Sequence, residues 1–366
     1  MRQRELISHW QLTCIIIGFL LGTTSIISFS ILYGKRDAWV GEIFAFGGGL
    51  LIFLMISYIV SKYPEKGVDE ILDDLLPPFL GKIILLHFFL FSIILGSFVI
   101  HNIQSLMKTM IMQETPSWVF IISMLVTVGI IIRYGIEVFA RCTEICVPAI
   151  LSATLLLLGL AVVTIFDFAN LLPAFTEPLT AHVKSFIVSV GFPYFQAVML
   201  IFVAVQVKKP GKKKIYLFPI LGLIIAGTIL ILRPVVSIGV FGQYEAQRLV
   251  FPIFSITRQI MMGDFLERVE LFMLVVWFLN VFIKLGVCIF VAAKSVQYLA
   301  GIKNYKNIVL PTALIMAPVG INAYGNFQDV LVLIGSTWIL VTVVLQLLPF
   351  GLIFAACLYK NSFKAS

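Results

Sequence analysis

Stretches of about 20 apolar residues recur along the whole chain, and this recurrence constrains the fold more than any other feature. Such a stretch crosses a bilayer as a helix, because inside lipid every backbone N–H and C=O group must find its partner within the segment. The composition agrees: 60% of the 366 residues are hydrophobic and 12% are charged, a balance that soluble domains do not show. The sequence therefore predicts an all-α integral membrane protein.

Ten apolar stretches can be delimited as transmembrane helices, in one domain that spans residues 1–366. The ninth is the least regular, because Pro311 and Pro318 lie within it. The first could be read as a signal peptide, but its apolar run continues to Tyr33, which favours a span. The predicted spans cover residues 12–33, 39–61, 82–108, 117–134, 143–166, 186–206, 215–239, 268–296, 307–322 and 330–358.

The distribution of Lys and Arg residues predicts the orientation in the membrane. With a cytoplasmic N-terminus, that side carries 17 of the 26 cationic residues and the other side carries 8, Arg233 among them, while Lys284 falls within a span. Both termini are therefore predicted to be cytoplasmic. The net charge of +8 and the Lys-rich loop at residues 208–214 fit contact with lipid headgroups, and no nucleic-acid partner is expected.

Two of the longer polar connections show a helical pattern of their own. Residues 62–81 combine four acidic residues with the sequence LLPPFLG, which indicates a short cytoplasmic helix at the membrane interface. The sequence LVFPIFSITRQIMM in the connection 240–267 has an amphipathic helical period. We expect this second segment to lie on the outer face without crossing the membrane.

Two spans contain helix-breaking sequences at matching positions of the two halves of the chain. Span 1 is interrupted at residues 18–25, and span 6 carries VGFPYFQ at residues 190–196. Proline removes a backbone donor and opens the hydrogen-bond ladder of a helix. With five spans in each half, spans 1 and 6 run in opposite directions. The pattern predicts an inverted repeat, with repeat 1 at about residues 8–166 and repeat 2 at about residues 184–360.

Broken helices at the midplane expose backbone ends that can bind a small zwitterion. The N-terminal end of a half-helix favours a carboxylate, whereas the carbonyl-rich ends favour an ammonium group. Gly22 lets a ligand approach the backbone, and the hydroxyls of Thr23, Thr24 and Ser25 can bind the ligand or the freed carbonyls. The alternative is close helix packing, because Gly18 and Gly22 also have the spacing of a small-residue packing motif.

Two further polar residues within the spans are candidates for the site. Lys284 lies near the centre of span 8, where a charge is costly and indicates function. It could replace a bound metal ion or act as a titrating group, or its side chain could snorkel or lie in a salt bridge inside the bundle. Gln196 follows the break in span 6 and can both donate and accept hydrogen bonds, which favours it as a ligand contact.

Three segments resemble the B subunit of the nutrient germinant receptors of spore-forming bacteria, the GerA type of spore germination protein. They are LLGTTSI in span 1, SVGFPYFQAVMLIF in span 6, and FPIFSITRQIMMGDFLERVELFMLVVWF at residues 251–278, which is the most specific. In the last segment Glu267, Arg268, Glu270 and Trp277 fit the family pattern. The family is part of the amino acid/polyamine/organocation superfamily, so the resemblance implies a LeuT-type fold with ten helices, a 5+5 inverted repeat and broken helices 1 and 6.

The resemblance also implies a function, a place in the cell and partners. Such a subunit senses an amino acid or another small nutrient in the inner spore membrane, together with an A subunit and a C lipoprotein. The family's ligand region corresponds here to Gly22, Thr23, Thr24 and Ser25 of span 1, and to Gly191, Phe192, Tyr194 and Gln196 of span 6. Related sequences often have a glutamate where this chain has Gln196, and smaller residues than Pro193 and Tyr194.

Three classes of function remain to be compared. The first is a nutrient receptor that signals to partner subunits during germination. The second is an amino acid permease, or secondary transporter, of the same fold. The third is a structural or conductive subunit, in which the small residues serve packing or a pore. The four histidines and the few acidic residues are scattered without nucleophile or metal-ligand spacing, so we expect no enzyme, no cofactor and no metal site.

Overall fold

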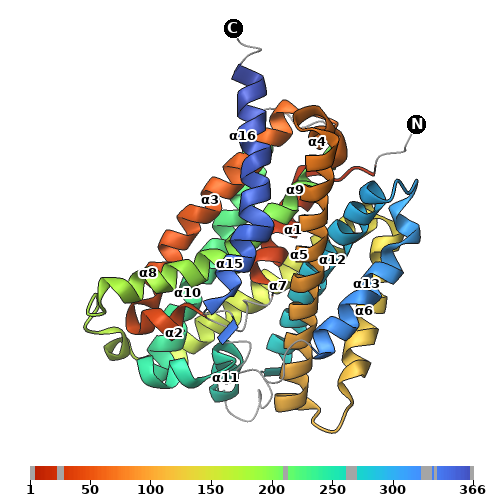
Figure 1. Cartoon of the computed structure of the whole chain (residues 1–366). Coiled ribbons are helices and arrows are strands. Elements are labelled where there is room, and N and C mark those ends of the chain that lie inside the picture. Colours follow the sequence, from red (N-terminus) through yellow and green to blue (C-terminus); the bar gives the residue numbers. More distant parts are fainter. Residues whose placement is uncertain are drawn as a thin grey trace.

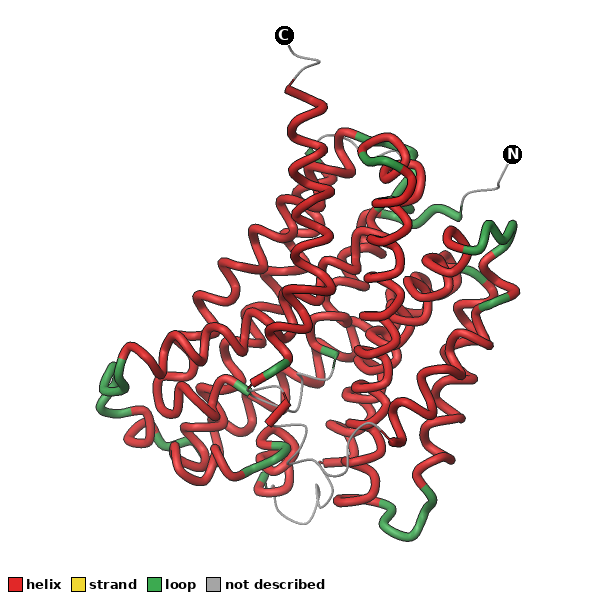
Figure 2. The backbone as a smooth tube through the Cα atoms, viewed as in Figure 1, coloured by secondary structure: helices red, strands yellow, loops and turns green. Residues whose placement is uncertain are grey.

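The computed structural model describes residues 5–22, 29–208, 213–260, 270–322, 332–333 and 336–362. Helices make up nearly all of this part of the chain, and loops lie mainly at the two ends of the bundle (Figure 2). The described residues contain no β-strand, only an isolated parallel bridge between Ile7 and Val207. Both ends of the chain lie at one end of the bundle, called here the terminus-bearing end (Figure 1).

The first half of the chain begins with a helix that is broken inside the bundle. Ser8 and Gln11 start this helix with a capping box, because the Ser8 hydroxyl accepts from the Gln11 N–H at 3.1 Å and the Gln11 side chain accepts from the Ser8 N–H at 2.9 Å. The helices of this half are α1 (His9–Leu21), α2 (Ser30–Gly34), α3 (Ala38–Lys62), α4 (Val68–Leu75), α5 (Pro78–Leu106), α6 (Ser117–Tyr134) and α7 (Ile136–Thr164).

The second half also begins with a broken segment. A π-helical turn (Val190–Tyr194) and a 3-10 segment (Phe195–Leu200) separate its first two helices. Another π-helical turn, at Val343–Leu347, lies between the last two helices. The helices of this half are α8 (Leu179–Ser189), α9 (Ile201–Ala204), α10 (Lys214–Arg248), α11 (Pro252–Gln259), α12 (Glu270–Leu299), α13 (Val309–Asn322), α15 (Trp338–Thr342) and α16 (Leu348–Ser362).

The membrane-spanning character predicted from the sequence is confirmed. Eight helical segments in the described part of the chain are long and apolar enough to cross a bilayer, and α1 and α13 are shorter apolar helices. The predicted count of ten spans thus stays a prediction. Span 4 was predicted at residues 117–134 and α6 covers those residues, whereas α7 starts seven residues before its predicted beginning at residue 143.

The two predicted non-spanning helices are also present. In α4 the apolar residues Val68, Ile71 and Leu72 are buried, while acidic residues occupy the first turn, so the helix is amphipathic. The helix α11 has eight residues, too few to cross a bilayer, and it lies at the end of the bundle opposite the termini (Figure 1). Both α4 and α11 pack against longer helices of the bundle.

The core of the bundle lies where α12 packs along α5 and against α1. Both α12 and α5 are long, and most of their central residues are buried, whereas α6 and α13 lie side by side at one edge of the molecule (Figure 1). The aromatic side chains that are fully buried include Phe19, Phe91, Phe98 and Trp277. The helix α12 therefore connects the broken first segment to the centre of the bundle.

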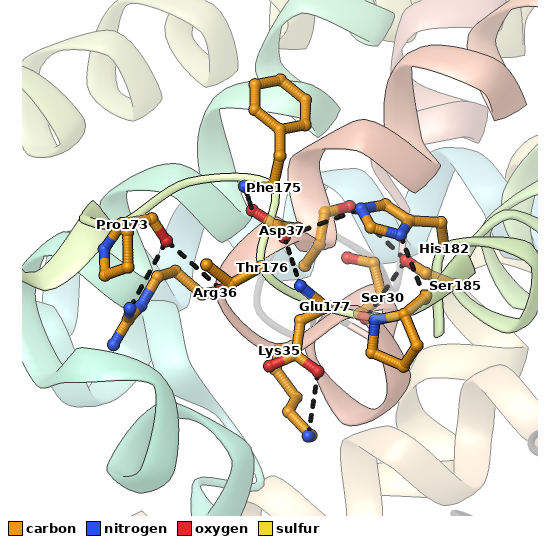
Figure 3. Close-up of polar contacts among 12 residues, drawn as sticks. Ser30, Lys35, Arg36, Asp37, Pro173, Phe175, Thr176, Glu177, His182 and Ser185 are labelled. Carbon is orange, nitrogen blue, oxygen red and sulfur yellow. Dashed lines mark hydrogen bonds and ion pairs between the residues drawn. The ribbon is translucent and has the colours of Figure 1, made fainter. Parts of the chain in front are cut away.

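A polar cluster at the end opposite the termini joins the two broken segments. The fully buried Asp37 carboxylate accepts hydrogen bonds from the backbone N–H groups of Phe175 at 2.8 Å and Glu177 at 3.2 Å. The His182 imidazole of α8 lies 3.6 Å from the same carboxylate (Figure 3). The Ser185 hydroxyl of α8 donates to the Ser30 carbonyl of α2 at 3.3 Å. The cluster holds α8 and α2 together.

Candidate ligand-binding site

The predicted break in span 6 is present at Phe192. Its backbone angles, φ −145° and ψ 103°, are those of an extended residue inside an otherwise helical segment. Pro193 follows it and has no N–H to donate, so the regular ladder cannot continue through this point. The whole stretch from Val190 to Leu200 is buried apart from partial exposure of Phe195. An irregular backbone at this depth is tolerated only inside the protein, which is where this one lies.

The break in span 1 was predicted at residues 18–25, but residues 18–21 are helical and the break begins at Gly22. Helix α1 ends at Leu21, and Gly22 caps it with a hydrogen bond from its N–H to the Gly18 carbonyl at 2.9 Å. The backbone of Gly22 has φ −1° and ψ −114°, outside the helical range. The next described helix, α2, starts at Ser30. The candidate ligand residues Thr23, Thr24 and Ser25 lie outside the described residues, so their predicted contacts stay predictions.

The two broken segments run in opposite directions, as an inverted repeat requires. Ile7 precedes α1 and Val207 follows α9, and these two residues form the isolated bridge. The Ile7 N–H donates to the Gln206 carbonyl at 2.9 Å, and the Lys208 N–H donates to the Ile7 carbonyl at 3.0 Å. The start of the first broken segment therefore lies beside the end of the second.

Lys284 of α12 lies between the two breaks. Its Nζ is 5.2 Å from the ring centre of Phe19 in α1 and 4.6 Å from the ring centre of Phe192 at the second break. Both distances are within the range of cation–π attraction. The stem of Lys284 packs against Gly22, where an added β-carbon would lie 3.1 Å from the Lys284 Cβ and still closer to its Cδ. Gly22, Phe192 and Lys284 thus form one contact cluster.

Further aromatic side chains surround Phe192. Its ring centre lies 5.1 Å from that of Phe29, 5.4 Å from that of Phe98 and 5.8 Å from that of Trp338. These rings come from the second part of span 1, from α5 and from α15, so the cluster draws on helices of both repeats. We call Phe19, Phe29, Phe98, Phe192 and Trp338 the aromatic cluster. Sequence reasoning did not find Phe98 and Trp338, because nothing separates them from the other aromatic residues of apolar spans.

The other predicted site residues face different neighbours. A β-carbon on Gly191 would lie 3.0 Å from Ile339 of α15. Tyr194 packs against Gly49 of α3, and its hydroxyl lies on the side of Gly227 of α10. Gln196 is fully buried and its side-chain amide has no hydrogen-bond partner among the described residues. The structure therefore brings Gly22, Phe192 and Lys284 together, while Tyr194 turns toward α3 and α10.

A buried charge pair near Tyr194 is a feature that the sequence did not reveal. Glu42 of α3 is 4% exposed and Arg233 of α10 is 2% exposed, and the two interact electrostatically with each other and with Tyr194. The sequence-based count placed Arg233 among the loop cations, and this placement is wrong because the side chain is buried inside α10. The sequence gives no signal that singles out Glu42, because an acidic residue near the start of a span is common.

The described cavities lie away from the two breaks. The larger, about 380 Å³, is at the terminus-bearing end, and the second, about 220 Å³, adjoins it at Asp69, Gln297 and Tyr298. Gly22, Phe192 and Lys284 line neither cavity. At the breaks, the rings of the aromatic cluster lie close to one another and to Lys284.

A second polar cluster lies at the terminus-bearing end and connects the N-terminal segment to the loops around it. The Glu5 carboxylate accepts hydrogen bonds from the Tyr305 hydroxyl and from the Ile136 N–H, both at 2.8 Å, and forms an ion pair with Lys306. Lys306 also donates to the Tyr134 carbonyl at 3.0 Å. Burial, and next the neighbouring Glu5 carboxylate, raise the pKa of Tyr305 far above its ordinary value. The hydroxyl therefore stays protonated and remains a donor at neutral pH.

Solved structures with the same fold include a Na⁺-coupled symporter. The structure of MhsT in complex with L-phenylalanine matches with a TM-score of 0.66 and 13% identity, over 94% of this chain and 89% of that one. A substrate-bound, Na⁺-coupled sialic acid symporter matches with a TM-score of 0.65 and 11% identity, over 94% and 80%. These likenesses confirm the predicted LeuT-type fold.

Sequence comparison gives the family. Spore germination protein KB of Bacillus subtilis (strain 168) is 26% identical over 330 residues, which are 89% of this chain and 87% of that protein. Spore germination protein A2 of the same strain is 24% identical over 75% of this chain and 74% of its own length. Spore germination protein XB of Bacillus anthracis is 25% identical over 76% and 78%. The family model described as spore germination protein matches residues 6–326, and the chain therefore belongs to this family.

Proposed function

We propose that this chain is the nutrient-sensing B subunit of a spore germinant receptor. In this proposal it binds an amino acid or a similar small germinant between the broken spans 1 and 6. The observation that carries the proposal is the meeting of both breaks at Lys284, at a fully buried position in the bundle. The family supports the link to germination, and the fold supports a small ligand, because the related MhsT structure holds L-phenylalanine.

Binding at this place supplies a signal because Lys284 and the rings of Phe19 and Phe192 pack together there. A ligand bound there has to separate Lys284 from Gly22 or from the Phe192 ring, which displaces the broken segments relative to α12. A ligand shifts a conformational equilibrium only if it prefers one state, and a pocket that exists only in the open arrangement provides that preference. The displaced half-helices would then pass the change to partner subunits.

The partners in this proposal are an A subunit and a C lipoprotein subunit in the inner spore membrane. Both termini face the cytoplasm, which accords with their position at one end of the bundle. Affinity purification of the tagged chain from spore membranes is expected to recover a larger membrane subunit and a lipoprotein. Recovery of the chain alone under conditions that preserve membrane complexes would argue against the assembly. The role is one of binding and signalling, without catalysis.

The binding role is tested in spores of the organism that carries the chain. Phe192→Ala removes the central ring of the aromatic cluster, and we expect it to raise the amino acid concentration needed for germination at least tenfold. Phe44→Ala serves as the matched control, because Phe44 of α3 is 63% exposed on the outside of the bundle. An unchanged germination response in the Phe192→Ala spores, with normal protein levels, would contradict the proposed site.

An amino acid permease is the second candidate function, favoured by the transporter fold alone. The two functions differ in flux. Purified protein in sealed vesicles, supplied with radiolabelled amino acids and an ion gradient, would accumulate label if it were a transporter. A receptor binds the same amino acid without accumulation. Accumulation that exceeds passive leakage and is abolished by Phe192→Ala would establish the permease.

A further inference from the structure

The buried ammonium group of Lys284 has no chemical partner in the part of the chain that the structure describes. The residue is 0% exposed, and its Nζ has no hydrogen-bond acceptor. Its Nζ lies over the faces of the Phe19 and Phe192 rings. No described carboxylate forms a salt bridge with it, whereas the other deeply buried cation, Arg233, interacts with Glu42. Lys284 is therefore a buried amine whose charged form has no counter-charge among the described residues.

The surroundings of Lys284 stabilise a cation only in part. Ring faces carry a partial negative charge, and so does the C-terminal end of α1 at Leu21. Neither replaces the full negative charge that a buried ammonium group requires, and neither gives its N–H groups the acceptors that water would provide. An anion bound at the two breaks would supply both.

We propose that Lys284 selects a nutrient that has a carboxylate. The ammonium group of Lys284 pairs with this carboxylate when the nutrient is bound between the two breaks. This inference rests on the proposed function, and it narrows the ligand class to small molecules with a free carboxylate. Lys284 lies against Gly22 and Phe192, so a group bound at either break is within reach of Nζ. The Coulomb attraction between an ammonium ion and a carboxylate is also stronger inside the protein than in water.

The competing role for Lys284 is that of a built-in substitute for a metal cation. A hard cation is surrounded by several oxygen ligands at bonding distance. A lysine that replaced such an ion would donate hydrogen bonds to those oxygens. Nζ instead faces ring carbons and donates to no described oxygen, so the geometry favours a lysine that pairs with an anionic ligand.

The test compares carboxylic acids with uncharged analogues. The full-length protein in lipid nanodiscs is titrated with L-alanine, L-valine and L-phenylalanine, with the amides of the same amino acids, and with D-glucose. We expect the wild type to bind at least one of the acids ten or more times more tightly than its amide. In Lys284→Met, which keeps the volume and loses the charge, we expect the affinity for that acid to fall at least tenfold, to the level of the amide.

Two further variants separate charge from packing. Lys284→Arg keeps the charge and is expected to retain a preference for the acid, which a purely structural role would not produce. Lys294→Met is the matched control: Lys294 also lies on α12 and also faces aromatic rings, with Nζ 4.5 Å from the ring centre of Tyr305, but at the terminus-bearing end. It should leave the acid preference unchanged. Thermal unfolding of each variant shows whether it is folded.

The outcomes distinguish this inference from the proposed function. An acid preference that persists in folded Lys284→Met overturns the role of Lys284 and leaves a nutrient receptor in place. Binding of D-glucose, and of no acid, by the wild type would also overturn the role of Lys284 and leave a nutrient receptor in place. Restoration of acid binding in Lys284→Met by added Na⁺ would assign the metal-substitute role and also overturn the inference. Failure of folded wild-type protein to bind any probe overturns the proposed function and this inference together.

Discussion

Gly22 and Lys284 are in direct contact across the interface of α1 and α12, so closely that a β-carbon at position 22 would overlap the lysine stem. The contact explains why the broken end of α1 carries glycine at this position. It also makes α12 the element that joins the two breaks, because the same lysine faces Phe192. A substitution of Gly22 should therefore change the stability of the protein by displacing the Lys284 side chain.

Replacement of Gly22 by alanine is expected to destabilise the protein by about 1–3 kcal/mol, the usual range for an overpacked core. Shortening the lysine should relieve the overlap, so Gly22→Ala/Lys284→Ala should be more stable than the sum of the single changes indicates. Thermal and denaturant unfolding in detergent measure the stability of the wild type, the two single variants and the double variant. Gly159→Ala is the control, because a β-carbon there meets nothing within 4 Å. Strict additivity of the two changes would show that the contact is unimportant.

Removing one member of the Glu42 and Arg233 pair should leave a buried charge without its partner. For Glu42→Gln we expect a loss of about 3–5 kcal/mol, with a much smaller loss in Glu42→Gln/Arg233→Met, where neither charge remains. Unfolding of the purified variants provides the comparison. Glu137→Gln, which breaks the exposed pair with Arg141, should lose about 0.5 kcal/mol or less. A double variant no more stable than Glu42→Gln would contradict this account.

The loop before α8 should depend on Asp37. Asp37→Ala removes the acceptor for the N–H groups of Phe175 and Glu177, each a hydrogen bond to a buried charged group (Figure 3). Such bonds contribute about 1.5–3 kcal/mol, so amide exchange in this loop should become roughly tenfold faster or more. Hydrogen exchange followed by mass spectrometry measures it. Lys35→Met, which removes only the partly exposed pair with Glu177, should leave the rate nearly unchanged.

The contact between Tyr305 and Glu5 should stabilise the terminus-bearing end over a wide pH range. Tyr305→Phe removes a hydrogen bond to a carboxylate and should destabilise the protein by about 1.5–3 kcal/mol. Because the pKa of Tyr305 is raised in the folded state, its contribution is complete below the ordinary pKa of about 10 and is lost only at still higher pH.

The pH profile and a control complete this test. The difference in Tm between wild type and Tyr305→Phe should stay constant from pH 6 to 9. Tyr134→Phe should have no effect, since Tyr134 is 70% exposed. A difference that disappears within that pH range would mean that the tyrosine hydroxyl does not act as the donor assumed here.

Local sequence patterns determined the membrane-spanning helices and the two breaks. A run of apolar residues forms a helix in lipid whatever its neighbours are, and the Gly-x-Pro sequence at residues 191–193 opens the hydrogen-bond ladder at its own position. For this reason α6 coincides with its prediction and the irregular backbone falls at Phe192, inside the predicted VGFPYFQ segment. The charge of Lys284 within a span was equally visible, because it contrasts with every residue around it.

Only the tertiary structure decided which side chains meet. Phe98, Phe192 and Trp338 come from three helices that are far apart in the sequence, and each is one of many aromatic residues in apolar spans. The interaction of Glu42 with Arg233 likewise depends on the packing of α3 against α10. Helix contacts in a membrane arise from the fit of whole surfaces, and a local small-residue motif does not determine which other helix it meets. The sequence thus located the breaks, and the fold supplied their neighbours.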